Sequence, residues 1–540
     1  MAILKDFVER LKSFSPQERR AIFFYICGIM LYKFGLEAFN GSITALATNR
    51  YDYESDTRGT PSRTFERLGL LQGLNQATQC VGSILIAPLI KHYPTKNVLS
   101  AAILLFGLMT AILLILDAAT GGTFVPEAYR KKHPKDEWSY YGDYNNDAII
   151  PIYTVTGIAY GMVELIRRVI PRDIVGGNVQ KLRQMDSLVH IFYEVAGTSG
   201  AFVTALVMIP NLGNNRSFVI TPICFSLAAI LWFFVVDGSH DRNALARAEA
   251  RKSNYFINIG KGFLLFFESI WVGAKILFTS TRFVWLVPAY GVALYGHRYL
   301  ENGIAPQVAR RYLGNSAWSQ IMVGGSNFGE LLGALFVFLF TNVIKTPIPW
   351  LRLDALMLLI VWYIPYWYPP SGQVGQAWIV AATFLPVSFG WAAGDVSLAA
   401  FIQASLARLE DKENRVSPLG AVMAFLYSFY IVTYAIAGTF LGRYLDGVYN
   451  RTGSVREALV NTAGVHFTVI MVTVFASTFI PKGSRCFNPE MLDDTKLDED
   501  IEESRVAKKT LWRSLRSTKH IEKGDERFGR RPDVPVNLPT

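Results

Sequence analysis

Residues 98–116 of the chain read VLSAAILLFGLMTAILLIL, a run of nineteen residues without a charged side chain. A helix that crosses the hydrocarbon core of a bilayer needs about 20 predominantly apolar residues. Similar apolar blocks recur along the chain and predict twelve spans, at residues 21–47, 67–90, 97–118, 148–166, 186–209, 217–236, 281–301, 317–343, 351–368, 375–400, 418–446 and 460–481. The sequence therefore predicts an all-α membrane protein with about twelve transmembrane helices.

The composition of the 540-residue chain agrees with this class. Charged residues make up 18% and hydrophobic residues 51%, whereas soluble domains carry about 25% charged residues. The formal net charge is +10, but the basic residues lie beside the apolar blocks. This placement favours anionic lipid headgroups over nucleic acid as the acidic partner. The four cysteines show no paired spacing, so neither a disulfide framework nor a zinc site is predicted.

One apolar segment, at residues 255–278, is left out of the spans. Its charged residues Lys261, Glu268 and Lys275 are seven positions apart, which places them on one face of a helix. A helix with one polar stripe and aromatic residues elsewhere suits the membrane surface better than the membrane interior. We therefore expect an interfacial amphipathic helix within a central cytoplasmic connector at residues 237–280.

The connectors on one side of this map hold most of the short-loop lysines and arginines. Because such residues keep a connector in the cytoplasm, we expect both termini on the cytoplasmic side. We expect the protein itself to reside in the plasma membrane or in a vacuolar or other endomembrane. The terminal segments 1–20 and 483–540 are predicted to be cytoplasmic, the second of them disordered. Two glycosylation triplets, beginning at Asn215 and Asn450, fall on the outer side of the map.

The two halves of the chain share short motifs in the same order. The matches pair residues 73–76 with 324–327, Gly157 and Gly161 with Gly390 and Gly394, and residues 190–193 with 427–430. Many transporters are built from such repeats, and their substrate binds at the repeat interface. The matches predict two six-helix bundles in parallel repeat, at residues 21–236 and 281–482.

This architecture resembles the major facilitator superfamily over roughly residues 20–482. The loop that joins the second and third helices of that family reads approximately Gly-x-x-x-Asp-Arg-x-Gly-Arg-Arg. Here residues 88–96 read PLIKHYPTK, without the aspartate and both glycines. Residues 164–176, ELIRRVIPRDIVG, are similar to fungal members of the superfamily. The resemblance implies a eukaryotic, fungal source.

Ionisable side chains in the middle of a span are candidates for function, because charge inside a bilayer is costly unless it is paired or hydrated. Asp186, His190 and Glu194 are four residues apart and share one face of the fifth helix. His190 and Glu194 are candidates for a proton pathway and equally for a structural ion-pair network. Asp186, near the cytoplasmic end, is expected to form gating or structural ion pairs with the basic residues Arg167, Arg168 and Arg172.

The first helix carries Lys33 and Glu37 one turn apart. Lysine before glutamate is the weaker order for a helical ion pair, so each side chain can find a partner on another helix. We expect Glu37 to face His190, or Lys33 to meet Glu194. Further polar residues complete the predicted substrate pathway: Asn40, Gln76, Glu164 and Tyr427.

The second half offers its own candidates for the same pathway. Glu330 lies deep in the eighth helix and needs a polar partner, for which His297 or Arg298 of the seventh helix is suited. Asn327 lies one turn before Glu330. Asp395 of the tenth helix is either a carboxylate that reaches the cavity or one that is capped by hydroxyl groups.

These features predict a secondary active transporter of a small polar or charged solute, which works by alternating access as a monomer, with protons as a candidate coupling ion. Two alternatives stay open. One is a transition-metal exporter that uses the histidines and carboxylates above, and the other is a transporter-like receptor or scaffold that moves no solute. No nucleophile elbow, phosphate-binding glycine loop or zinc signature stands out, so we predict neither an enzyme nor a bound cofactor.

Overall fold

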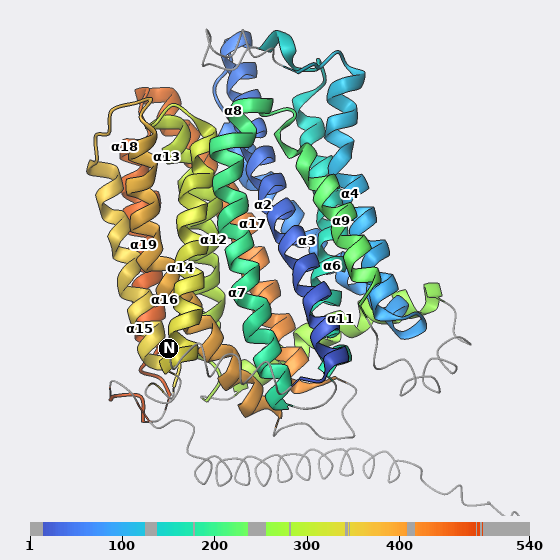
Figure 1. Ribbon diagram of the computed structural model, residues 1–540. Coiled ribbons are helices and arrows are strands. Elements are labelled where there is room, and N and C mark those ends of the chain that lie inside the picture. The colour runs from blue at the N-terminus through green and yellow to red at the C-terminus, as the bar shows by residue number, and fades with distance from the viewer. Residues whose placement is uncertain are drawn as a thin grey trace, which may run out of the picture.

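The computed structural model describes residues 14–124, 138–175, 179–235, 255–279, 282–340, 344, 346–407, 416–481, 483–486 and 489. Within these ranges the chain forms helices and no β-strand. The helices run side by side in one bundle, with the first half of the chain (blue to green) beside the second half (yellow to red) (Figure 1). The predicted all-α fold class is confirmed.

The described part of the first half forms six crossing segments. They are α2 (Pro16–Arg58), α3 (Thr64–His92), α4 (Thr95–Ala119), α6 (Ile149–Val175), α7 (Val179–Val203) continued by η3 (Thr204–Met208) and α8 (Ile209–Leu212), and η4 (Ser217–Val219) with α9 (Ile220–Phe233). The short 3-10 helices η1 (Trp138–Tyr140) and η2 (Asn146–Ala148) precede α6.

The described part of the second half forms six more. The first is a continuous run of η5 (Val287–Val292), α12 (Ala293–Tyr299), η6 (Leu300–Ile304) and α13 (Ala305–Arg311). The others are η7 (Ser316–Trp318) with α14 (Ser319–Phe340), α15 (Ile348–Met357) with η8 (Leu358–Tyr366), α16 (Val374–Ala407), α17 (Pro418–Thr452), and α18 (Arg456–Leu459) with η9 (Val460–Val465) and α19 (His466–Ser477). The twelve segments of the described residues match the twelve spans expected from the sequence.

Local sequence explains where α2 begins and ends. The Ser15 hydroxyl accepts a hydrogen bond from the backbone N–H of Glu18, and the Glu18 carboxylate accepts one from the N–H of Ser15, which together form a capping box. At the other end Gly59 takes a left-handed conformation, with φ of 61°, and its N–H bonds the carbonyl of Ser55. We call the end of the bundle at which α2 begins the near side, and the end at which it stops the far side.

The two halves meet along two pairs of helices, α3 with α17 and α7 with α14. The absence of side chains lets α3 and α17 touch in the far half of the bundle. A Cβ atom on Gly69 would lie 2.5 Å from the carbonyl oxygen of Gly438, and one on Gly442 would lie 2.2 Å from that of Phe65. Glycine is therefore required where the halves approach most closely.

The predicted internal repeat is reproduced at this interface. Gly73 of α3 packs on Ala435 of α17, and its counterpart Gly324 of α14 packs on Phe202 of α7. Each of these contacts joins one half to the other.

The glycines matched between α6 and α16, the fourth crossing segments of the two halves, do not pack against equivalent helices. Gly157 and Gly161 of α6 pack on the backbone of α3, whereas Gly390 and Gly394 of α16 pack on α15. In the second half, the corresponding close approach between α14 and α16 uses glycines of α14 instead, namely Gly325, Gly329 and Gly333.

The connector helix α11 (Tyr255–Thr279) reaches both halves. In the described ranges nine helices are long and apolar enough to cross a membrane, and α11 is one of them by length and composition. Its contacts lie on the near parts of the crossing helices, where Tyr255 donates a hydrogen bond to the carbonyl of Leu85 in α3 and Gly273 packs on Ala421 of α17. In Figure 1 it lies at the lower end of the bundle. These contacts place α11 across the near side.

Candidate functional site

The first half contributes a buried ion pair at the centre of the bundle. Lys33 and Glu37, 8% and 7% exposed, form a salt bridge of 2.5 Å within α2. The Lys33 ammonium also lies 4.6 Å from the ring centroid of Tyr193 in α7, a favourable cation–π distance. The sequence had suggested partners on other helices for both residues, but the structure pairs them with each other.

A second ion pair lies on α6. Arg167 contacts Glu164 at 2.6 Å, and the Tyr32 hydroxyl donates a hydrogen bond of 2.8 Å to the same carboxylate. The Arg167 guanidinium lies 4.5 Å from the Tyr193 ring. Arg167 is thus held by Glu164, and its predicted pairing with Asp186 stays a prediction. The side chains of Asp186, Arg168 and Arg172 lie outside the part of the chain that the structure describes.

The polar residues of α7 face the second half. Glu194 is 3% exposed, and its Oε2 has no hydrogen-bond partner among the described residues; the same holds for Nε2 of the half-buried His190. The charge of Glu194 acts on Lys33 of α2 and on Glu330 of α14. Lys33 therefore meets Glu194 electrostatically, without a contact within salt-bridge distance among the described residues.

Across the interface, α12, η6 and α14 supply the charges of the second half. Arg298 forms an ion pair of 2.8 Å with Glu301, whose other oxygen accepts a hydrogen bond of 2.6 Å from Ser326. Glu330 interacts electrostatically with Arg298 but has no described ion pair. The Arg298 side chain is 43% exposed, although it interacts with Tyr160 and residues of α14 and α17. Solvent thus reaches this position between the halves.

His297 belongs to a different environment. Its Nε2 lies 2.7 Å from the Asp354 carboxylate, and its ring stacks on Trp391 at 4.9 Å. His297 and Asp354 are 3% and 0% exposed, inside the second bundle. Of the two partners predicted for Glu330, Arg298 interacts with it electrostatically without a described ion pair, and His297 is paired with Asp354. Adjacent residues on a helix point about 100° apart, which explains why only one of them faces the centre.

The remaining predicted residues are distributed between the interface and the cores. Gln76 accepts a hydrogen bond from Tyr430 and so joins α3 to α17, while Asn40 accepts one of 3.0 Å from Tyr153 inside the first half. Tyr427 accepts one of 3.1 Å from Tyr290 inside the second half. Asp395 is half-buried in α16.

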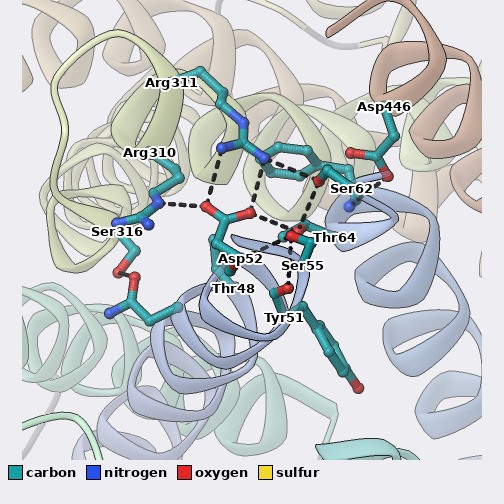
Figure 2. Close-up of polar contacts among 12 residues, drawn as sticks. Thr48, Tyr51, Asp52, Ser55, Ser62, Thr64, Arg310, Arg311, Ser316 and Asp446 are labelled. Carbon is teal, nitrogen blue, oxygen red and sulfur yellow. Dashed lines mark hydrogen bonds and ion pairs between the residues drawn. The ribbon is translucent and has the colours of Figure 1, made fainter. Parts of the chain in front are cut away.

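A network on the far side, which the sequence did not reveal, closes the interface (Figure 2). Asp52 of α2 is 3% exposed and receives ion pairs from Arg310 at 2.6 Å and Arg311 at 2.8 Å, both from α13. It also accepts a hydrogen bond of 2.6 Å from the Thr64 hydroxyl. Beside it, Ser316 donates a hydrogen bond of 2.9 Å to Asn49. We call these residues the far-side gate.

The N-terminus of α3 is held by the second half next to the gate. The Asp446 carboxylate accepts hydrogen bonds of 2.9 Å from the backbone N–H groups of Phe65 and Glu66. Asn450 accepts from the N–H of Ser62 and donates to its carbonyl, both at 2.9 Å. A residue of α17 thus caps α3, as an N-cap side chain does within one helix.

The interface between the gate and the centre is tightly packed. A cavity of about 10 Å³, room for roughly one water molecule, lies there between α3, η6, α13 and α17. Phe65, Tyr299, Gln307 and Tyr434 are among its lining residues. A solute at the centre is therefore separated from the far side by packed protein.

The structure corrects one expectation about glycosylation and bears on another about metals. Asn215 is 0% exposed and donates hydrogen bonds to Asp117 at 3.0 Å and to the Tyr140 carbonyl, so its side chain has no room for a glycan. Asn450 is exposed but is engaged with Ser62. Among the described residues, no three His, Cys, Asp or Glu side chains converge on a position for a metal ion.

Comparisons with solved structures place this fold among transporters. The chain aligns with a D-xylose-proton symporter at a TM-score of 0.57 and 14% identity, over 88% of this chain and 98% of that chain. It aligns with a mutant of nucleoside transporter NupG at 0.55 and 11%, over 85% and 99%. The chain has the major facilitator fold.

The chain also aligns with peptide transporter POT in complex with sulfate, at a TM-score of 0.54 and 14% identity, over 85% of this chain and 94% of that chain. No model of a protein family and no curated protein matches the sequence. The apolar helices and this fold identify an integral, multi-pass membrane protein of transporter architecture. The fungal source expected from residues 164–176 stays a prediction.

Proposed function

We propose that the chain is a secondary active transporter that moves a small polar or charged solute across a membrane by alternating access. The observation that carries the proposal is the convergence, at the centre of the bundle, of charged side chains from both halves: Lys33, Glu194, Arg298 and Glu330. Charged side chains inside a membrane bundle mark substrate and ion paths in membrane proteins. A solute bound there would contact both halves, as a rocking mechanism requires.

The closed far side supports the same mechanism. The gate around Asp52 and the cap formed by Asp446 join the halves on that side, while the solvent-accessible Arg298 lies at the centre. We take the near side as cytoplasmic, because the basic connectors predicted to be cytoplasmic lie there. The arrangement then corresponds to the state in which the solute site is shut off from the outside.

We also propose that protons drive transport. Glu194 Oε2 and His190 Nε2 are buried without hydrogen-bond partners, so a proton can be taken up there without breaking a described bond. One of the structures with this fold is by its name a D-xylose-proton symporter. Uptake into proteoliposomes should change with an imposed pH gradient and lose this dependence when a protonophore is added.

The experiment that tests transport locks the far-side gate. Asn49→Cys and Ser316→Cys place two thiols where the native side chains share a hydrogen bond of 2.9 Å. Proteoliposomes with this double variant, in a background whose four native cysteines are replaced, are incubated with a cell extract, and the enclosed solutes are identified by mass spectrometry.

We expect one or more solutes to be enriched under reducing conditions, to lose enrichment on oxidation, and to regain it with a thiol reductant. Each single cysteine variant is the matched control, since it cannot form the cross-link. If no solute is enriched in any state, the chain is instead a receptor or scaffold with a transporter fold. Enrichment that is indifferent to the cross-link would exclude alternating access through this gate.

A further inference from the structure

We infer that the transported solute carries a positive charge, as in an amine or a quaternary ammonium group, and that Glu194 and Glu330 bind it between the two halves. The inference rests on the proposed transport function and names the chemical class of its substrate.

Two carboxylates at the centre, those of Glu194 and Glu330, do not take part in the ion pairs described there. Each described cation at the centre has its own carboxylate, at 2.5 Å in the pair Lys33–Glu37, 2.6 Å in Arg167–Glu164 and 2.8 Å in Arg298–Glu301. Neither Glu194 nor Glu330 has an ion pair within 4 Å among the described residues. With both carboxylates ionised, the site has an excess of negative charge, which a cationic solute would neutralise.

The two surplus carboxylates come from opposite halves. Glu194 lies on α7 and Glu330 on α14, which are the helices along which the halves meet. Their charges act on each other, and their helices approach closely, since a Cβ atom on Gly197 of α7 would lie 3.3 Å from the Asn327 amide of α14. A cation between them would link the halves in the closed state and would be released from one carboxylate as the halves part.

A further buried group points to a ligand at the same place. Asn327, one turn before Glu330, is 5% exposed, and its Nδ2 has no hydrogen-bond partner. A Cβ atom on Gly197, one turn after Glu194, would lie 3.3 Å from that nitrogen and 2.5 Å from Cε of Lys33. An unpartnered amide of the second half thus reaches the helix of Glu194. Buried polar groups are normally hydrogen-bonded, so an acceptor atom of a bound ligand, such as a hydroxyl or carbonyl oxygen beside its cationic group, is the natural partner of this N–H donor.

The same inventory disfavours the other classes of solute. An anion would face two carboxylates while every described cation at the centre is already paired. A transition metal would require a set of ligands with defined geometry, and the described residues hold no group of three His, Cys, Asp or Glu for it. An organic cation needs only the opposite charge and a few hydrogen-bonding groups.

The test uses the full-length protein in liposomes of uncharged phosphatidylcholine and a panel of radiolabelled probes. Choline, spermidine and lysine are the cationic probes, glucose and uridine the neutral ones, and succinate the anionic one. Uptake is measured for the wild type, for Glu194→Gln and Glu330→Gln, and for Glu268→Gln on the exposed face of α11 as the matched control. Thermal unfolding of each purified variant checks that it is folded.

We expect uptake of at least one cationic probe, a loss of tenfold or more in both site variants, and no change in the control. For a folded variant, binding of the same probe should be lost together with uptake, as read from the shift in unfolding temperature. Uptake of a cation that both variants leave intact would overturn the site. Uptake of none of the cations would overturn the inference, and entry of the neutral or anionic probes alone would do so while leaving the transport function standing.

Discussion

At the scale of single residues, Asp52 links three side chains of the far-side gate. Its two oxygens receive Arg310, Arg311 and the Thr64 hydroxyl, from α13 and from the start of α3. Arg311 in turn lies 4.0 Å from the Tyr449 ring of α17. One carboxylate of the first half thus fixes two cations of the second, and removing its charge would remove the carboxylate with which both arginines form their ion pairs.

We expect Asp52→Asn to open the far side. Loss of one partner of a buried ion pair costs about 3 kcal/mol, at the low end of the usual range because Arg310 is 27% exposed. This corresponds to roughly a hundredfold larger open population. The measurement is the rate at which a membrane-impermeant thiol reagent labels Ser316→Cys, which lies at a position that is 3% exposed in the closed state.

The matched control for this prediction is Glu66→Gln. Its partner Arg63 lies on the same helix start and is 62% exposed, so the pair is worth about 0–1 kcal/mol. Labelling should change little in this variant. Equal rates in Asp52→Asn and the wild type would mean that the ion pairs of Asp52 do not hold the gate.

At the scale of elements, α11 has a face that no described element covers. Phe256, Leu264, Phe267 and Trp271 are 79%, 72%, 65% and 73% exposed, although all are large and apolar. Such a surface on a monomeric protein marks a contact with lipid or with another molecule. Because α11 also contacts the near parts of α3 and α17, its exposed face fits the interface of the bilayer at the near side.

We expect spin labels along α11 to lie at one depth. Labels at residues 256, 264, 271 and 278 are compared by their collision rates with oxygen, which prefers the bilayer, and with a water-soluble nickel chelate. A helix in the interface gives similar, shallow values at all four positions. A helix that crosses the membrane would instead give a maximum of oxygen exposure near its middle. Labels at 104 and 108 on the exposed face of α4 serve as the crossing reference.

The elements could be predicted from the sequence better than the contacts between them. Apolar blocks are local patterns, and they sufficed for the all-α fold class. The seven-residue spacing of Lys261, Glu268 and Lys275 is also local, and the interfacial position that it predicts for α11 stays a prediction. Glu194 and Glu330 could be found in the same way, because a charge in mid-span is visible in one stretch of sequence. The sequence did not show that Glu194 and Glu330 lack an ion pair among the described residues.

The far-side gate could not be predicted because its partners are distant along the chain. Asp52 and Arg310 are 258 residues apart, and both lie where a charged residue at the end of a span is unremarkable. The same reason applies to His297 with Asp354 and to the burial of Asn215. A usable signal was the placement of an aspartate shortly after the first predicted span of one half, at 21–47, and of two arginines shortly after the first predicted span of the other, at 281–301.

At the scale of the whole molecule, the two halves touch most closely where glycine removes the side chain. Near Gly69 and Gly442 the backbones of α3 and α17 are in direct contact in the far half of the bundle. The gate, the cap on α3 and this backbone contact therefore act on the same side. If the halves rock as rigid bodies, forcing them apart there must bring them together on the near side.

We expect Gly69→Leu to drive that rocking motion. The added Cβ would lie 2.5 Å from the Gly438 carbonyl oxygen, and separation of α3 and α17 would relieve this clash. The control is Gly447→Leu on the same α17, where an added Cβ meets no atom within 4 Å. Spin-label distances are measured by pulsed electron paramagnetic resonance for one pair on the far side, at residues 58 and 452, and one on the near side, at residues 17 and 480. In Gly69→Leu the far-side distance should lengthen and the near-side distance shorten, because the site can open to one side only by closing to the other. Lengthening of both distances would indicate loosening of the bundle rather than alternating access, and no change in either would show that the glycine contact does not set the state of the transporter.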